Sequence, residues 1–335
     1  MSKEIIKVNN LKTYFYLSTG IVKAVDGVSF RINEGETLGI VGESGSGKSV
    51  TASSIMRLVA NPIGRIVDGE ILFEGKDLLK LKEKEMLSIR GKEISMIFQD
   101  PMTSLDPVFT IGQQIMEVIK IHQNVSDKEV KKIAVEALNM VGIPEAEKRL
   151  NSYPHEFSGG MRQRVIIAMA IVCKPKMIIA DEPTTALDVT VQAQVLDLLK
   201  DLQRQLGTSI LMITHNLGVV WDICDKVMVM YAGKTVEYAD ARTLYSNPRH
   251  PYTLGLLNSM PKLSDDPDKP LTVIPGGPPD LKLTGNACNF YNRCAYAQDI
   301  CQEKDPQLLE VNENHFVACH FQTETKSLKI KGEKV

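Results

Sequence analysis

The sequence predicts an α/β fold with a parallel sheet, and three observations carry that prediction. Short apolar runs typical of buried parallel strands recur at 38–41, 177–180, 210–213 and 227–230. Segments with helical periodicity accompany them, at 128–141 and 189–206. A glycine-rich loop follows the first run directly, which indicates a strand–loop–helix unit.

The elements before and after the first loop complete this picture. Two strands are expected near residues 5–8 and 25–32, and they form an antiparallel β part ahead of the loop. Residues from about 84 to 172 are expected to be mostly helical. After about residue 245, prolines become frequent and cysteines follow them. We therefore predict a first domain over 1–245 and a small Pro- and Cys-rich domain over 246–335, whose Lys-rich end at 326–335 is expected to fray.

Length and composition narrow the class of protein. The chain has 335 residues, enough for about two domains. The 39 Lys and Arg residues are balanced by 41 Asp and Glu residues, so no nucleic-acid partner is expected. The longest apolar run, 165–173, is too short to cross a bilayer, and the first residues do not resemble a signal peptide. A cytosolic globular protein is the expectation.

The glycine-rich loop predicts a phosphate site. It matches the pattern G-x-x-x-x-G-K-[ST], in which backbone N–H groups face phosphate oxygens. Lys48 would reach the β- and γ-phosphates of ATP, and the Ser49 hydroxyl would bind Mg²⁺. The predicted loop residues are Gly42, Glu43, Ser44, Gly45, Ser46, Gly47, Lys48, Ser49 and Val50.

A pair of acids at the end of a later strand fits the same chemistry. Asp181 and Glu182 follow the apolar run at 177–180. One carboxylate can hold Mg²⁺ and the other can act as the base that activates water. Together with the loop, this pair predicts an ATPase whose nucleotide-binding domain is the first domain, over 1–245.

At 157–164 the sequence resembles the ATP-binding cassette (ABC) family, whose signature motif these residues match. In that family Ser158, Gly159 and Gly160 would close over the ATP bound by a partner cassette. By itself the string at 162–164 could instead be a solvated helix face.

The other family motifs follow in order. The resemblance assigns Gln99 to Mg²⁺ and the attacking water, and His215 to the γ-phosphate. Asp188, in the string 186–188, would link the two sites of a dimer, and Tyr14 would stack on adenine, with Phe15 and Tyr16 as neighbouring aromatics. The implied reaction is hydrolysis of MgATP in which Glu182 activates water and two ATP molecules close a pair of cassettes.

The C-terminal part resembles the extension of ATPases that serve bacterial oligopeptide and dipeptide importers. The strings at 247–253 and 276–281 carry this resemblance. It implies a motor subunit at the cytoplasmic face of the membrane that works with a second homologous ATPase, as a hetero- or homodimer. Two transmembrane permeases and, indirectly, an extracellular substrate-binding protein complete the implied assembly. Dipeptides, longer peptides and nickel all stay open as cargo.

Functions outside transport were weighed as alternatives. Chromosome-maintenance cassettes separate the loop and the signature by long coiled coils, but Lys48 and Ser158 are only 110 positions apart. Translation-type ATPases usually carry two cassettes in one chain, whereas this chain has one. A regulatory metal-binding module with a passenger ATPase is the third alternative.

Six cysteines remain to be explained in a reducing setting. Cys288, Cys294, Cys301 and Cys319 are widely and unevenly spaced, which favours a larger cluster over the close pairs of zinc sites. Because similar importer ATPases carry these cysteines, we expect a 4Fe–4S cluster that staples the tail, with Zn²⁺ and unmetallated or disulfide-bonded thiols as alternatives. His315 and His320 could replace a missing thiolate, and Cys173 and Cys224 are expected to be core residues.

Overall fold

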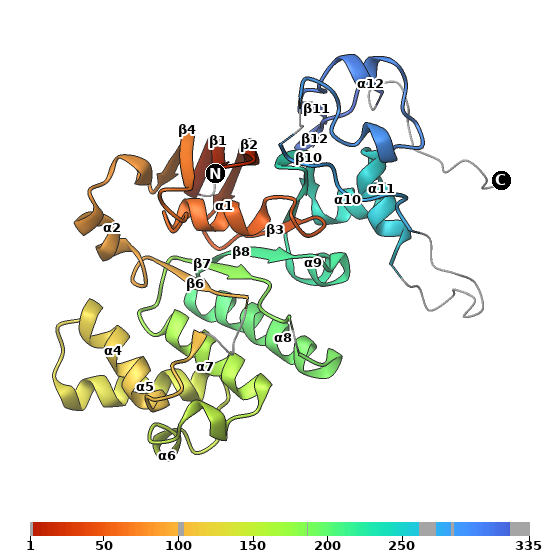
Figure 1. Ribbon diagram of the computed structural model, residues 1–335. Helices are drawn as coiled ribbons and strands as arrows, with labels where there is room; N and C mark the ends of the chain where they lie inside the picture. Colours follow the sequence, from red (N-terminus) through yellow and green to blue (C-terminus); the bar gives the residue numbers. More distant parts are fainter. Residues whose placement is uncertain (1–2, 100–103, 186, 261–272, 283–284, 322–335) are drawn as a thin grey trace. The chain divides into compact units, whose positions relative to one another are not determined.

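The computed structural model describes residues 3–99, 104–185, 187–260, 273–282 and 285–321 (Figure 1). The chain divides into two compact units, each built from separate stretches of sequence. The first unit comprises residues 1–6, 32–37 and 73–213. The second unit comprises residues 7–31, 38–72 and 214–335. In this second unit, residues on both sides of the predicted boundary at about 245 lie together, and that boundary stays a prediction.

Three parallel strands form the sheet of the first unit, in the order β8–β7–β6. They are β6 (Ile94–Ile97), β7 (Met177–Asp181) and β8 (Ser209–Thr214). The expectation of a mostly helical stretch over 84–172 overlooked β6, because Ser95 interrupts a run of only four residues. β6 pairs residue by residue with β7, so the ends of these two strands lie beside each other.

The helices of the first unit begin at sequence signals that the chain supplies. Ser126 caps α5 by accepting a hydrogen bond from the Glu129 amide, and Thr110 caps α4 in the same way. The predicted helices at 128–141 and 189–206 are confirmed as α5 and α8. The helical elements are η1 (Leu78–Lys80), α2 (Glu83–Ile89), α4 (Ile111–His122), α5 (Asp127–Met140), α6 (Ala146–Arg149), η2 (Pro154–Glu156), α7 (Gly159–Ile171) and α8 (Val189–Leu206); the short strand β5 (Lys76–Asp77) also lies here.

The second unit contains a five-stranded sheet in the order β3–β9–β10–β12–β11. β3 and β9 are parallel, and the remaining pairs are antiparallel. The strands are β3 (Thr37–Val41), β9 (Lys226–Tyr231), β10 (Lys234–Asp240), β11 (Leu309–Asn312) and β12 (His315–Val317). The cysteine-rich tail thus contributes two strands to this sheet, which the sequence analysis did not predict.

The second unit also contains strands of a second sheet and several helices. β1 (Glu4–Leu17), β2 (Gly20–Asn33) and β4 (Gly64–Phe73) are neighbours in the order β2–β1–β4. The helices are α1 (Lys48–Ile55), α9 (Leu217–Ile223), α10 (Ala241–Ser246), α11 (Pro251–Asn258), η3 (Tyr291–Arg293) and α12 (Ile300–Glu303). The predicted α/β class is confirmed. Within the described ranges, no helix has both the length and the apolar character that a membrane span requires.

Candidate functional site

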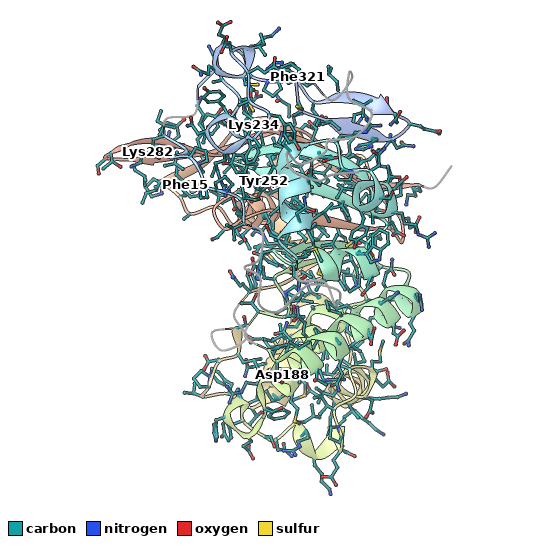
Figure 2. The ribbon with its side chains drawn as sticks, turned by 90° about the vertical axis from the view of Figure 1, so that its right-hand side faces the viewer. Phe15, Asp188, Lys234, Tyr252, Lys282 and Phe321 are labelled. Atoms are coloured by element: carbon teal, nitrogen blue, oxygen red, sulfur yellow. The ribbon has the colours of Figure 1, made fainter. Side chains whose placement is uncertain are left out.

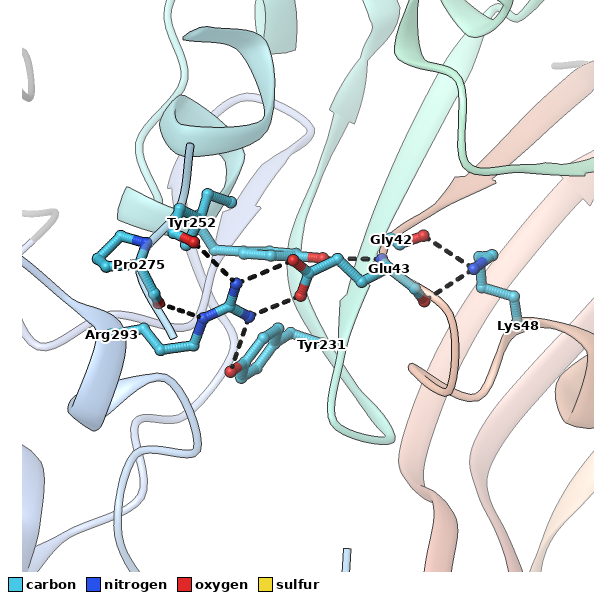
Figure 3. A network of polar contacts seen from close by, with 8 residues as sticks. Gly42, Glu43, Lys48, Tyr231, Tyr252, Pro275 and Arg293 are labelled. Carbon is cyan, nitrogen blue, oxygen red and sulfur yellow. Dashed lines mark hydrogen bonds and ion pairs between the residues drawn. The ribbon is translucent and has the colours of Figure 1, made fainter. Parts of the chain in front are cut away.

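The predicted phosphate loop connects β3 to α1 in the second unit (Figure 3). Lys48 is 4% exposed, and its ammonium donates hydrogen bonds to the carbonyl oxygens of Gly42 (2.8 Å) and Glu43 (2.9 Å). These bonds close the loop into a ring around its exposed tip at Ser44 and Gly45. The lysine therefore stands where an anion held by the loop would meet a positive charge.

Two glycines allow this conformation. Gly47 has φ = 104°, and a Cβ there would lie 2.3 Å from the Ala24 carbonyl oxygen. A Cβ on Gly42 would lie 2.2 Å from the carbonyl oxygen of Met230. Only glycine fits at either position. Gly47 is also the N-cap of α1 and has no side chain to cap it, so the positive end of this helix lies at the loop, where it favours an anion.

The predicted acid pair lies in the first unit. Asp181 is the last residue of β7 and is 5% exposed. Glu182 has φ = 48° and donates its backbone N–H to the carbonyl of Ile213 (2.8 Å), so the chain turns sharply at the end of β7. The change of direction gives the two consecutive carboxylates different surroundings.

Gln99 and Glu182, two of the predicted site residues, are brought together at the ends of neighbouring strands. Gln99 Nε2 donates to Glu182 Oε2 at 2.9 Å, because Gln99 follows β6 and β6 lies beside β7. Thr185 Oγ1 donates to the same carboxylate oxygen, also at 2.9 Å. Thr185 was not among the predicted site residues; its position three residues after Glu182, in a turn, is the sequence signal for this contact.

The signature residues begin α7. Ser158 accepts a hydrogen bond from the Met161 amide (3.4 Å) as the N-cap, and Gly159 and Gly160 form the first turn. The alternative of a solvated face at 162–164 is wrong, because Gln163 is 1% exposed. The arginines on either side of Gln163 donate to backbone carbonyls: Arg162 to Pro154 and Arg164 to Val141.

Asp188 is the N-cap of α8, where its side chain accepts from the Val191 amide at 3.0 Å (Figure 2). Of the string 186–188, Ala186 lies outside the described residues, as do the residues at 100 and 101 that follow Gln99. The capping bond fixes the direction in which the chain enters α8.

In the second unit, His215 follows β8 and is exposed. The aromatic residues of β1 face different ways. Tyr14 donates its hydroxyl to Asp26 Oδ1 (2.7 Å); burial, with that bond, raises the pKa of the phenol. Thr13, one position earlier, instead bonds Ser54 of α1 (2.8 Å). Because strand side chains alternate, Phe15 lies on the Thr13 side, the face toward α1.

The four tail cysteines line one small cavity whose walls are largely aromatic. Burial raises the pKa of Cys288 to about 12 and that of Cys294 to about 11, and the neighbouring thiols contribute. The backbone N–H groups of Phe290 and Tyr296 donate to the sulfur atoms of Cys288 and Cys294. In the part of the chain that the structure describes, no three His, Cys, Asp or Glu side chains could together hold a single metal ion.

The other two cysteines differ from each other. Cys224 is 7% exposed and packs against Gly39, which confirms a core position. Cys173 is only half-buried and accepts a weak hydrogen bond from Gln123, so the expectation of a core cysteine is wrong there. All six cysteines lie in the described part of the chain, and none forms a disulfide.

Three features of this chain define an ABC-type ATPase. They are a phosphate loop between a buried strand and a helix, an acid pair after a second strand, and a signature helix with a serine N-cap. The family model described as "ABC transporter" matches residues 25–185. The model described as "Oligopeptide/dipeptide transporter, C-terminal region" matches residues 236–301. The chain belongs to the ABC transporter ATP-binding proteins that carry this C-terminal region.

Similar proteins cover most of the chain. The oligopeptide transport ATP-binding protein OppD of Bacillus subtilis (strain 168) is 55% identical over 313 residues, which are 93% of this chain and 87% of that protein. OppD of Salmonella typhimurium is 53% identical over 90% of this chain and 89% of its own length. OppD of Escherichia coli (strain K12) is 52% identical over 94% and 92%.

Solved structures confirm the cassette fold. One is described as the dimeric structure of a post-hydrolysis state of the ATP-binding cassette MJ0796 bound to ADP and Pi. It is 29% identical, with a TM-score of 0.63, and the match covers 71% of this chain and 99% of that chain. A second match is cbiO1 from Clostridium perfringens, 28% identical with a TM-score of 0.63, over 73% of this chain and 91% of that one.

Proposed function

We propose that this chain is the ATP-hydrolysing motor subunit of an importer of oligopeptides or dipeptides. The single observation that carries the proposal is the match of residues 236–301 to the C-terminal region of peptide transporters. Relatives at about half identity over nine-tenths of the chain, named oligopeptide transport ATP-binding proteins, support it. Nothing in these relatives' names supports nickel transport or a function outside transport.

The proposed roles in hydrolysis follow from the chemistry of each side chain. The Ser49 hydroxyl, the Gln99 amide oxygen and the Asp181 carboxylate are hard oxygen donors of the kind that Mg²⁺ prefers. Bound Mg²⁺ would neutralise phosphate charge. Lys48 and the loop amides stabilise the transferring phosphoryl group. Glu182 takes a proton from water, and His215 holds the γ-phosphate.

The partners are proposed from the same family membership. Ser158, Gly159, Gly160 and Asp188 would face the ATP of a second homologous ATPase. The dimeric cassette among the similar solved structures supports this arrangement. Two transmembrane permeases would hold the motor at the cytoplasmic face of the membrane as a peripheral subunit, with an extracellular binding protein delivering the peptide.

A 4Fe–4S cluster held by Cys288, Cys294, Cys301 and Cys319 is the proposed occupant of the cysteine cavity. Four sulfur atoms around one cavity, with backbone N–H groups directed at two of them, fit this group. A single Zn²⁺ ion needs about four ligands around one point, and the described residues include no group of three His, Cys, Asp or Glu side chains arranged in that way. When bound, the cluster would supply four Fe–S bonds that cross-link a tail with few apolar residues.

Two experiments test these proposals. In cells that lack the gene, uptake of a radiolabelled tripeptide should be restored by the wild-type chain but not by Glu182→Gln. Uptake restored by neither chain would contradict the motor role, and uptake restored by both would contradict the role of Glu182. Anaerobic purification followed by iron, sulfide and zinc analysis tests the metal. About four iron and four sulfide per chain are expected, whereas zinc alone or no metal would rule out the cluster.

A further inference from the structure

Glu43, in the phosphate loop, is bound at three of its groups by other residues of the second unit (Figure 3). Its carboxylate accepts two hydrogen bonds from Arg293, at 2.6 Å and 2.9 Å. Its backbone N–H donates to the hydroxyl of Tyr252 at 2.8 Å. Its carbonyl oxygen accepts from Lys48 at 2.9 Å. The residue that enters the loop is thus fixed on every polar group.

The first of these contacts is the strongest. Arg293 has only 5% of its side chain exposed, and the bidentate pair with Glu43 lies away from most of the solvent. The guanidinium stacks near the rings of Tyr231 and Phe290 and donates to the Pro275 carbonyl (2.9 Å). Partly buried bidentate pairs of this kind are short and directional, so they hold geometry better than exposed pairs do.

Arg293 belongs to the cysteine-rich segment. It precedes Cys294 directly and lies in η3, which follows Cys288 by three residues. A second connection runs parallel to the first. Asn289 donates to the Ala232 carbonyl (3.3 Å), and the next residue, Gly233, donates its N–H to the Ser46 carbonyl (3.0 Å). The segment between Cys288 and Cys294 therefore contacts the phosphate loop in two ways. Arg293 contacts it directly, and Asn289 contacts it through the turn at 232–233.

We propose that Arg293 is a positioning residue through which the cysteine-rich segment sets the nucleotide affinity of the phosphate loop. The inference rests on the proposed nucleotide role of the loop and adds a regulator to it. Arg293 binds the Glu43 carboxylate, whereas Lys48 binds the Glu43 carbonyl oxygen, so Arg293 acts on the shape of the loop and leaves the reacting atoms to Lys48. Through its two hydrogen bonds to the Glu43 carboxylate, Arg293 keeps Glu43 in place, and the loop loses that support when the pair is broken.

The test is a double-mutant cycle on the full chain, purified anaerobically, with MgADP as the probe in titration calorimetry. Glu43→Gln and Arg293→Gln should each raise the Kd for MgADP on the order of tenfold, within the range expected for coupling networks. The double variant should have a Kd for MgADP no higher than that of the single variant with the higher Kd, because the same interaction is lost in all three variants. Arg293→Lys should recover part of the affinity, and Arg242→Gln, at an exposed position on α10, is the matched control.

The Kd of each variant decides whether Arg293 acts on the phosphate loop through Glu43. If Glu43→Gln leaves the Kd unchanged, or if the two single effects multiply in the double variant, the inference is overturned. Glu43→Gln changes no residue of the cysteine segment, so it remains decisive even if Arg293→Gln unfolds that segment or loses iron. A purely structural role would lower the melting temperature without changing the KM for ATP; the proposal requires a higher KM with kcat retained. Failure of the wild-type chain to bind MgADP would instead refute the proposed ATPase site itself.

Discussion

Gln99 Nε2 lies 2.9 Å from Glu182 Oε2, although the two residues are 83 positions apart in the chain. The contact exists because β6 and β7 are parallel neighbours and both residues leave the sheet at the same edge. Gln99 and Thr185 are neutral donors, so they orient the Glu182 carboxylate without a full positive charge. A carboxylate oriented in this way suits a general base, which must be held in a fixed position toward the water that it activates.

Replacement of this base should therefore stop turnover and preserve binding. Glu182→Gln is expected to lower kcat by about 10²- to 10⁴-fold, the contribution of a general base, while MgATP still binds and the ATP-bound dimer persists. Phosphate release and light scattering measure the two effects. Glu136→Gln, at an exposed position on α5, is the control and should behave like wild type. Normal hydrolysis by Glu182→Gln would show that another group activates water.

The adenine contact can be assigned by comparing neighbours on β1. The resemblance assigned it to Tyr14, but the Tyr14 hydroxyl is bound to Asp26, and Phe15 lies on the face of β1 toward α1. Loss of one base–aromatic stack costs about 1–3 kcal/mol. Phe15→Ala should therefore raise the KM for ATP at least fivefold, by the lower figure, while Tyr14→Phe should leave it unchanged. If Tyr14→Ala weakens ATP binding and Phe15→Ala does not, the original assignment holds.

Local features of the chain were predictable from its sequence. The runs at 177–180 and 210–213 became β7 and β8 because a continuous apolar stretch bounded by polar residues suits a strand buried on both faces. The helix at 189–206 was predicted to its ends, since Asp188 caps it and Gly207 terminates it in the left-handed conformation. Motif strings identified the phosphate loop because its glycines and lysine are consecutive.

Contacts between distant residues were not predictable in this way. Arg293 and Glu43 are 250 positions apart, and no periodicity joins them. β12 is only three residues long, so its place beside β10 depends on pairing with a partner strand rather than on its own composition. Tyr14 and Phe15 are adjacent aromatic residues of β1, and the sequence does not show which of them faces α1. The orientation of the strand in the structure decides this.

A buried carboxylate joins the tail to the sheet of the second unit. Glu237, on β10, is 0% exposed and accepts hydrogen bonds from the amides of Arg249 and His250 and from His315 Nε2, on β12. Glu237→Gln would replace one acceptor by an NH₂ group and leave a buried donor without a partner, at a cost of about 1–3 kcal/mol. Hydrogen exchange at the amides of 249 and 250 should therefore accelerate. Glu313→Gln, in the exposed turn before β12, should change nothing; equal exchange in both variants would contradict the role of Glu237.

Alanine substitutions at Gly159 and Gly160 should distinguish a role in helix packing from a role in nucleotide contact. A Cβ on Gly160 would lie 2.6 Å from Val191 Cγ1 of α8, whereas a Cβ on Gly159 would meet Leu187 Cδ2 at 3.7 Å, an ordinary contact. Gly160→Ala should therefore destabilise the first unit by about 1–3 kcal/mol, as overpacking does, and Val191→Ala should restore stability. Gly159→Ala should unfold at the same temperature as wild type.

ATP turnover in the same variants then tests the role of the signature. If Gly159 and Gly160 both face the nucleotide of a partner cassette, Gly159→Ala should lower ATP hydrolysis with no loss of stability. Likewise, Gly160→Ala combined with Val191→Ala should regain its melting temperature but not its activity. Thermal unfolding and phosphate release on the same samples measure both quantities. Full activity in the stability-restored double variant would show that Gly160 is required only because α7 and α8 approach so closely.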